Sequence, residues 1–303
     1  MPRISLESRT AGFVLLGLLA VLWGASYPLL KVAVETVPPL TTAACRALLA
    51  TIVLFALLGG DLRRLTDPAL PRGRLAVQAF WISILPWCLL TWASTLIPAG
   101  TIAILSSTSP IWVFIITWGF TRHEPATGRK LAGTLLGIGG VLAIIGLDAL
   151  GGLGRHTLAQ SAAVVSAMAY AMAAVYGRHF AGVPPLVTAA ASTVIATAVL
   201  VPAALILERP LDSSPSVRSM LALAVLGVFC TAGALACYYR ILALLGSIAT
   251  ASQSYLRIGV SVVLAAVLLG ERLTASTYAG LVLVLAGVVA MTLPARTPIR
   301  KPQ

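Results

Sequence analysis

Three basic residues of this sequence lie inside stretches that are otherwise apolar, namely Lys31, Arg46 and Arg257. Lys31 and Arg46 are expected near one end of their stretches, where a long basic side chain can reach an aqueous boundary, and Glu35 is a partner for either. Arg257 lies about ten residues into its stretch, and no acidic residue is expected at the same depth. Its guanidinium could hold a substrate carboxylate through two hydrogen bonds, or bond backbone carbonyls in a structural role.

Aromatic and polar side chains supply the remaining candidates for a binding site. Trp23 and Tyr170 are expected a little over halfway along their stretches, with Tyr27 one helical turn beyond Trp23 on the same face. Aromatic walls accommodate apolar groups and attract ammonium groups, whereas hydroxyls can bond a ligand or simply pack helices. For Trp92 and Tyr239, the alternative is an aromatic anchor at the membrane interface. The expected substrate-binding residues are Trp23, Tyr27, Trp92, Ser107, Thr108, Tyr170, Tyr239, Gln253, Ser254 and Arg257.

Residues that would support enzymatic, metal or proton chemistry are peripheral in the sequence. The nine acidic residues and the three histidines all fall in expected loops, tails or stretch ends. The sequence contains no Cys-x-x-Cys pair, no His-x-x-x-His pair and no Gly-x-Ser-x-Gly motif. We therefore expect no enzyme, no metal site and no cofactor. Because proton coupling usually needs a carboxylate or histidine in the pathway, uncoupled transport is favoured over proton antiport.

The composition indicates which elements must position these residues. Of 303 residues, 59% are hydrophobic and only 10% are charged, and the mean hydropathy is +0.98. Soluble domains carry about 25% charged residues, whereas crossing a membrane takes about 20 apolar residues per helix. The net charge of +12 comes from basic residues near the ends of apolar stretches, which is typical of a lipid-facing rim and not of a nucleic-acid site. The sequence predicts an all-α membrane protein.

Pro, Gly and charged residues divide the apolar stretches into ten expected membrane helices. If the amino terminus is cytoplasmic, fourteen Lys and Arg residues fall on the cytoplasmic side and four on the opposite side. The positive-inside rule then places both termini in the cytoplasm. The expected helices span residues 11–34, 39–60, 75–95, 99–120, 131–149, 157–177, 184–207, 219–240, 247–269 and 277–294.

The chain also contains a weak internal repeat. A shift of 147 residues places Trp23 on Tyr170 and Glu124 on Glu271, and aligns two Gly residues of the fifth expected helix with two of the tenth. Two five-helix repeats follow, residues 1–149 and 150–303. Because five is odd, the second half must enter the membrane inverted. An inverted repeat is typical of secondary transporters, whose substrate binds between the halves near the midplane.

Three local patterns resemble a known family. Trp23-Gly24 followed by Lys31, Gly-Glu-Arg-Leu at residues 270–273 and Ala-Gly in the tenth helix are similar to the EamA-like drug/metabolite transporters, and in particular to YddG-type aromatic amino-acid exporters. The resemblance implies a 5+5 inverted-repeat exporter of amino acids or other small metabolites in a bacterial inner membrane. Many members have a proline near the middle of the ninth helix, where this chain has Ser254 to Gly259.

The sequence thus predicts a transporter that exports small amphipathic metabolites, amino acids first, by alternating access and without obligatory ion coupling. A functional monomer is expected, with the substrate and membrane lipid as its partners. Two alternatives are a proton-coupled drug/metabolite efflux antiporter and, from a different class, a membrane scaffold without transport. An inverted repeat argues against the scaffold, which has no use for opposite-facing halves. The direction of net transport is left open by the sequence.

Overall fold

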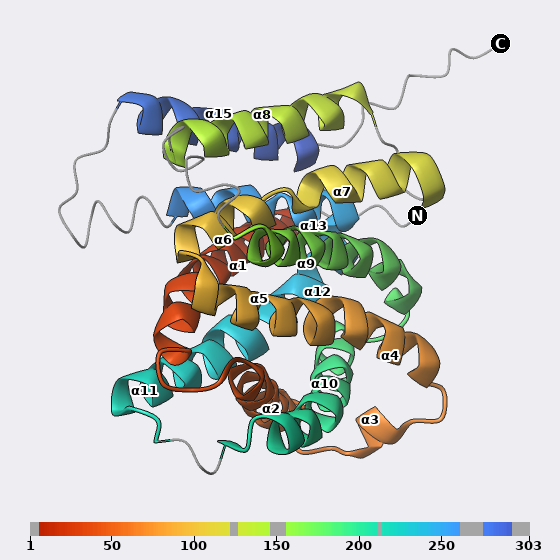
Figure 1. Ribbon diagram of the computed structural model, residues 1–303. Coiled ribbons are helices and arrows are strands. Elements are labelled where there is room, and N and C mark those ends of the chain that lie inside the picture. Colours follow the sequence, from red (N-terminus) through yellow and green to blue (C-terminus); the bar gives the residue numbers. More distant parts are fainter. Residues whose placement is uncertain (1–5, 122–126, 146–155, 211–213, 261–274, 293–303) are drawn as a thin grey trace.

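A computed structural model describes residues 6–121, 127–145, 156–210, 214–260 and 275–292, and every element in these residues is helical (Figure 1). Eight of the helices are long and apolar enough to cross a membrane. They are Thr10–Ala33, Pro39–Leu57, Arg72–Leu96, Ala99–Thr121, Thr157–Phe180, Pro185–Leu207, Val217–Leu245 and Ala275–Thr292.

Several of these spans are built from consecutive helical elements. The helical elements in the first half of the chain are α1 (Leu6–Ala33), α2 (Pro39–Leu57), α3 (Arg63–Thr66), α4 (Arg72–Ala79), η1 (Phe80–Ile84), α5 (Leu85–Leu96), α6 (Ala99–Ser106), α7 (Ser109–Ile116), η2 (Thr117–Thr121) and α8 (Gly128–Ile145). In the second half they are α9 (Thr157–Tyr176), η4 (Gly177–Phe180), α10 (Pro185–Leu207), α11 (Val217–Gly227), η6 (Val228–Gly233), α12 (Ala234–Leu245), α13 (Ser247–Ala251), helical residues 253–260 and α15 (Ala275–Thr292).

Each expected membrane helix overlaps helical residues, although some boundaries differ. The expected 131–149 helix corresponds to α8 over residues 131–145, and residues 146–149 lie outside the described residues. Of the expected 247–269 helix, residues 247–260 are described and 261–269 lie outside the described residues. The expected 219–240 helix runs on to Leu245, so that Arg240 is an exposed residue within a helix instead of marking its end.

The helices pack as pairs that join the two halves of the chain. At one edge of the molecule, α8 lies beside α15, and at the opposite edge α2 lies beside α10 (Figure 1). Between these edges, α1 packs along α11 and α12, and α9 packs along α5. The first helix of each half therefore contacts the third span of the other half, and these four helices surround the centre of the molecule.

Glycines allow α8 and α15 to approach closely. A Cβ atom added to Gly133 would lie 2.8 Å from the carbonyl oxygen of Gly287, and one added to Gly140 would lie 2.7 Å from that of Gly280. Small residues at such spacing let helix backbones touch inside a membrane. Gly133, the earlier glycine of α8, meets Gly287, the later glycine of α15, whereas Gly140 meets Gly280. The two helices are therefore antiparallel.

The third span of each half contains a π-helical turn. The first is η1 between α4 and α5, and the second is η6 between α11 and α12. A shift of 147 residues places Phe80–Ile84 on residues 227–231, so the two turns begin one residue apart and end two residues apart. Such turns insert one extra residue, redirect the side chains around them and are frequent at functional sites.

Candidate functional site

Side chains from both halves of the chain surround a small cavity at the centre of the helix bundle. Its volume is about 20 Å³, which is about the room that one water molecule needs. The wall is apolar and aromatic except for a serine and two arginines. The residues that line it are Trp23, Ser26, Tyr27 and Leu30 from α1, Arg46 from α2, Leu90 from α5, Tyr170 from α9, and Arg257 from residues 253–260.

Arg257 is buried at this cavity, with 4% of its surface exposed. The central carbon of its guanidinium lies 5.0 Å from the centre of the Tyr27 ring. This distance is within the range of a cation–π interaction, which is stronger where water is excluded. Arg257 and Tyr27 therefore bring a buried positive charge and an aromatic face to the same wall from opposite halves of the chain.

Arg46 is the second buried charge of the cavity, with 5% of its surface exposed. We expected its side chain to reach the headgroup region, but it points inward, with its guanidinium carbon 4.5 Å from the centre of the Trp87 ring. Arg46 lies seven residues into α2, about 10 Å along the helix axis, on the side that faces the bundle. Lys31, by contrast, is half-buried outside the cavity wall and donates a hydrogen bond to the carbonyl of Ser94 at 2.7 Å.

The π-helical turn η6 orients Arg46. The hydroxyl of Thr231 donates to the carbonyl of Leu226, five residues earlier, at 2.7 Å. Because its hydrogen is used in this way, the Thr231 oxygen presents lone pairs to the bundle and accepts from Nε of Arg46 at 3.2 Å. Thr231 thus satisfies a carbonyl of the irregular turn and fixes the arginine at the same time.

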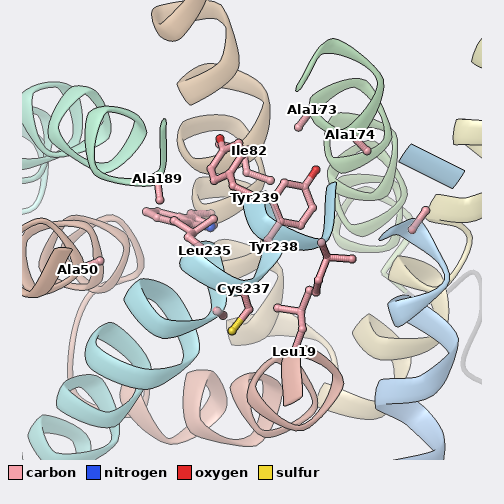
Figure 2. Close-up of a cluster of buried hydrophobic side chains, with 14 of the residues drawn as sticks. Leu19, Ala50, Ile82, Ala173, Ala174, Ala189, Leu235, Cys237, Tyr238 and Tyr239 are labelled. Atoms are coloured by element: carbon pink, nitrogen blue, oxygen red, sulfur yellow. The ribbon is translucent and has the colours of Figure 1, made fainter. Parts of the chain in front are cut away.

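An aromatic chain leads away from the cavity. Trp23 contacts Tyr170 with ring centres 6.0 Å apart and Tyr238 with ring centres 5.6 Å apart. Tyr238 in turn meets Tyr239 edge to face. Figure 2 shows both tyrosines projecting from α12 into the core near Ile82 and Ala173. Tyr239, an expected binding residue, therefore lies beyond the cavity wall.

The Tyr239 hydroxyl belongs to a buried hydrogen-bond network. It accepts from Nε2 of Gln78 at 3.1 Å and lies 3.0 Å from the hydroxyl of Ser192. Gln78 also donates to the carbonyl of Ala173 at 3.2 Å. The network joins α4, α9, α10 and α12, so it holds four helices together on one side of the cavity.

The structure places the other expected site residues away from the cavity wall. Ser107 donates to a carbonyl one turn earlier at 2.6 Å, and Thr108 does the same at 2.7 Å. The amide of Gln253 donates to the hydroxyl of Ser254 at 3.1 Å. Trp92 is 40% exposed on the outer surface. Of the ten expected residues, the cavity brings together Trp23, Tyr27, Tyr170 and Arg257.

The described residues of the cavity wall carry positive charge. They include two guanidinium groups and no carboxylate. The carboxylates whose contacts are described lie at helix ends, where Glu35 approaches Arg218 at 3.8 Å and Asp61 approaches Arg64 at 3.3 Å. In the same described residues, no group of three or more His, Cys, Asp or Glu side chains could hold a metal ion.

Comparison with known families connects this architecture to transport. The model of the EamA-like transporter family matches the chain twice, over residues 10–146 and 157–293. The chain belongs to this family. The two matches also establish that an EamA chain of this kind consists of two related halves.

EamA relatives of this chain span most of its length. It is 27% identical over 282 residues to the "Uncharacterized inner membrane transporter YedA" of Escherichia coli, covering 91% of this chain and 88% of YedA. It is 25% identical to "Protein PagO" of Salmonella typhimurium, covering 75% of each chain, and 23% identical to the "Uncharacterized transporter YoaV" of Bacillus subtilis over about half of each chain. With its eight apolar helices, this EamA chain is an integral inner-membrane protein.

The EamA fold is also present among solved structures. One protein of known crystal structure superposes with a TM-score of 0.75 at 22% sequence identity, covering 92% of this chain and 95% of the other. At this identity the likeness concerns the fold alone.

Proposed function

We propose that this protein exports small amphipathic metabolites that carry a carboxylate, with amino acids, including aromatic ones, as the first class to test. The observation that carries the proposal is the central cavity, where two buried arginines share one wall with Trp23, Tyr27 and Tyr170. Charged residues inside membrane proteins usually mark substrate pathways, and a guanidinium binds a carboxylate through two parallel hydrogen bonds. The aromatic wall suits the apolar part of such a substrate.

We infer that the two halves are inverted, with ten membrane helices in a 5+5 arrangement. Contacts between repeat-equivalent residues support this. Trp23 meets Tyr170, and the Ser107 hydroxyl lies 3.3 Å from the carbonyl oxygen of Ser254, both at an offset of 147 residues. Equivalent residues can touch only next to the axis that relates the halves. The antiparallel crossing of α8 and α15 fits a two-fold axis, which would pass beside the cavity at Trp23.

In this arrangement, transport takes place by alternating access around a fixed central site. A cavity of about 20 Å³ is too small for an amino acid, so it represents a state closed on both sides. The Gln78–Tyr239–Ser192 network would seal one side, and the bond between Lys31 and the Ser94 carbonyl would help to seal the other. By the positive-inside rule, both termini are placed in the cytoplasm. We propose a functional monomer without cofactor or enzymatic activity, since ten helices provide a complete pathway.

Transport without obligatory ion coupling is the favoured mechanism. A proton-coupled antiporter needs a group that gains and loses a proton along the pathway. Among the described residues, the cavity wall offers two arginines and no carboxylate or histidine. The alternative, proton-coupled drug/metabolite efflux, would require such a group elsewhere in the chain.

Transport assays in proteoliposomes test the proposal. We expect saturable uptake of radiolabelled aromatic amino acids by the purified protein, with no change when a pH gradient is imposed. Arg257→Ala should lower the rate at least tenfold because the buried counter-charge is lost. Arg240→Ala is the matched control, since Arg240 is exposed and does not line the cavity.

Three results would contradict parts of this proposal. Uptake that occurs only with a pH gradient would establish proton coupling. Equal rates for Arg257→Ala and the wild type, both folded, would remove Arg257 from the pathway. A failure to transport amino acids and other small carboxylates would refute the proposed substrate class.

A further inference from the structure

We propose that the transported species is a net anion whose carboxylate is held by the guanidinium fork of Arg46, and that organic acids without an ammonium group bind in preference to amino acids. This inference rests on the proposed transport function and narrows its substrate class. It is carried by three features of the cavity: the orientation of Arg46, the charge of the wall, and the occupation of its aromatic faces.

The orientation of Arg46 leaves its bidentate edge for a ligand. Its Nε donates to Thr231, and its guanidinium carbon lies over the Trp87 ring, 4.5 Å from the ring centre. Among the described residues, Thr231 is the only hydrogen-bond partner of the Arg46 side chain. The terminal nitrogens Nη1 and Nη2 therefore donate no hydrogen bond to these residues. A fixed guanidinium with both terminal nitrogens available matches the two oxygens of a carboxylate. Because Arg46 is only 5% exposed, bulk water does not compete for them.

The charge of the wall favours an anion over a zwitterion. Arg257 brings a second guanidinium to the same cavity, and the described wall contains no carboxylate that could receive an ammonium group. An ammonium group would therefore meet two like charges in a region of low dielectric constant, where repulsion is strong. A carboxylate would instead reduce the cost of holding the Arg46 guanidinium among apolar helices.

The aromatic faces do not offset this preference. A ligand ammonium group could in principle bind to a ring face, but the Tyr27 face carries Arg257 and the Trp87 face carries Arg46. Trp23 is flanked by Tyr170 and Tyr238. The rings that line the cavity, those of Trp23, Tyr27 and Tyr170, suit the hydrocarbon part of an organic acid together with Leu30 and Leu90.

Three compounds with the same phenyl group separate the charge classes. 3-Phenylpropionate carries a carboxylate alone, and phenethylamine carries an ammonium group alone. Phenylalanine carries both a carboxylate and an ammonium group. Binding to the purified full-length protein is measured by calorimetry at pH 7.5. We expect 3-phenylpropionate to bind at least tenfold more tightly than phenylalanine and phenethylamine to bind weakest. Equal or tighter binding of phenylalanine would overturn the inference.

Substitutions then test the role of Arg46. Arg46→Gln should weaken 3-phenylpropionate binding at least tenfold and abolish the preference over phenylalanine. Because losing a buried charge could affect folding, Thr231→Val provides a second variant that retains Arg46 and removes the hydroxyl that orients it. We expect a three- to tenfold loss of affinity for the acid.

The control is Thr51→Val, which removes a hydroxyl that lies 2.9 Å from Thr197 between α2 and α10, outside the cavity wall. Unchanged selectivity in folded Thr231→Val and Arg46→Gln would contradict the assignment.

An anion that crosses without a coupled proton also carries current. In proteoliposomes with an imposed potassium diffusion potential, an interior positive by 60 mV should raise the equilibrium accumulation of 3-phenylpropionate about tenfold. Protein-free vesicles correct for passive entry of the protonated acid. Accumulation that ignores the potential would overturn the inference. If phenylalanine is transported and the acid is not, the inference fails while the proposed function stands. If neither the acid nor any amino acid is transported, the proposed function itself fails.

Discussion

Gly137 of α8 is a residue whose missing side chain shapes the interior. A Cβ atom at this position would overlap the ring of Tyr255, which is fully buried and donates through its hydroxyl to the carbonyl of Thr134 at 3.0 Å. The glycine therefore lets a large aromatic side chain lie flat against a helix backbone. Tyr255 stands two residues before Arg257, so the same contact supports the segment that carries the cavity arginine.

Gly137→Ala should destabilise the protein because the new methyl group collides with a ring that has no free space beside it. Overpacking of this kind costs about 1–3 kcal/mol. The measurement is the midpoint of thermal unfolding in detergent, and Gly139→Ala is the control, since nothing lies within 4 Å of a Cβ atom there. A midpoint for Gly137→Ala that equals or exceeds that of the control would show that Tyr255 moves aside without cost.

At the scale of elements, the start of α2 depends on the other half of the chain. Glu208 follows α10 and accepts from the backbone nitrogens of Leu40 at 2.9 Å and Thr41 at 2.6 Å, and from the Thr41 hydroxyl at 2.8 Å. A carboxylate at a helix amino terminus satisfies free backbone donors and interacts favourably with the helix dipole. Because α2 carries Arg46, this cap helps to fix the depth of the arginine.

Glu208→Ala should lower the free energy of unfolding by about 1–2 kcal/mol, the usual cost of losing a helix cap. The effect is read from thermal unfolding of the purified protein. Glu35→Ala provides the comparison, because the pair of Glu35 with Arg218 is largely exposed and such pairs contribute little. Equal effects of the two substitutions would mean that the cap bonds contribute no more than a surface pair.

The elements themselves follow closely from the sequence, because apolar length sets each membrane helix and proline and glycine set its ends. The site follows only in part. Depth along a helix and the repeat identify Trp23, Tyr170 and Arg257, but depth does not give the direction of a side chain, and Arg46 points into the bundle instead of toward the surface. The π-helical turn that receives it has no pattern in the sequence. Serine and threonine hydroxyls such as those of Ser107 and Thr108 bond carbonyls of their own helix, which residue type alone does not reveal.

A repeated motif in the sequence marks the start of α2. Val-Pro-Pro-Leu occurs at residues 37–40 and again at residues 183–186, an offset of 146 residues, which marks the starts of α2 and α10 as equivalent. At the same offset, the hydroxyls of Thr51 and Thr197 lie 2.9 Å apart. The motif would have aligned Arg46 with Ser192 and drawn attention to a charge present in only one half.

At the scale of the whole molecule, the proposed transport cycle has the network around Tyr239 close one side of the cavity. Tyr239→Phe removes the hydroxyl that meets Gln78 and Ser192, and each lost hydrogen bond weakens the closed state by about 1 kcal/mol. We expect faster hydrogen–deuterium exchange of the backbone amides in α4 and α10, by about tenfold, and unchanged exchange in α8 and α15. Ser166→Ala is the control, since that hydroxyl bonds only its own helix. Unchanged exchange in α4 would show that the hydrogen bonds of Tyr239 do not hold this side of the cavity closed.

The two cavity arginines do not follow the repeat that relates the surrounding helices, because neither has an arginine at the equivalent position in the other half. Arg46 aligns with Ser192 and Arg257 aligns with Pro110. In the proposed inverted arrangement, the state open to the cytoplasm and the state open to the outside would have nearly the same helix packing, with the two halves exchanging their roles. The charges break that equivalence. A carboxylate that enters from the cytoplasm and one that enters from outside would meet the arginines in a different order, so the protein could release on one face what it holds on the other while its scaffold favours neither.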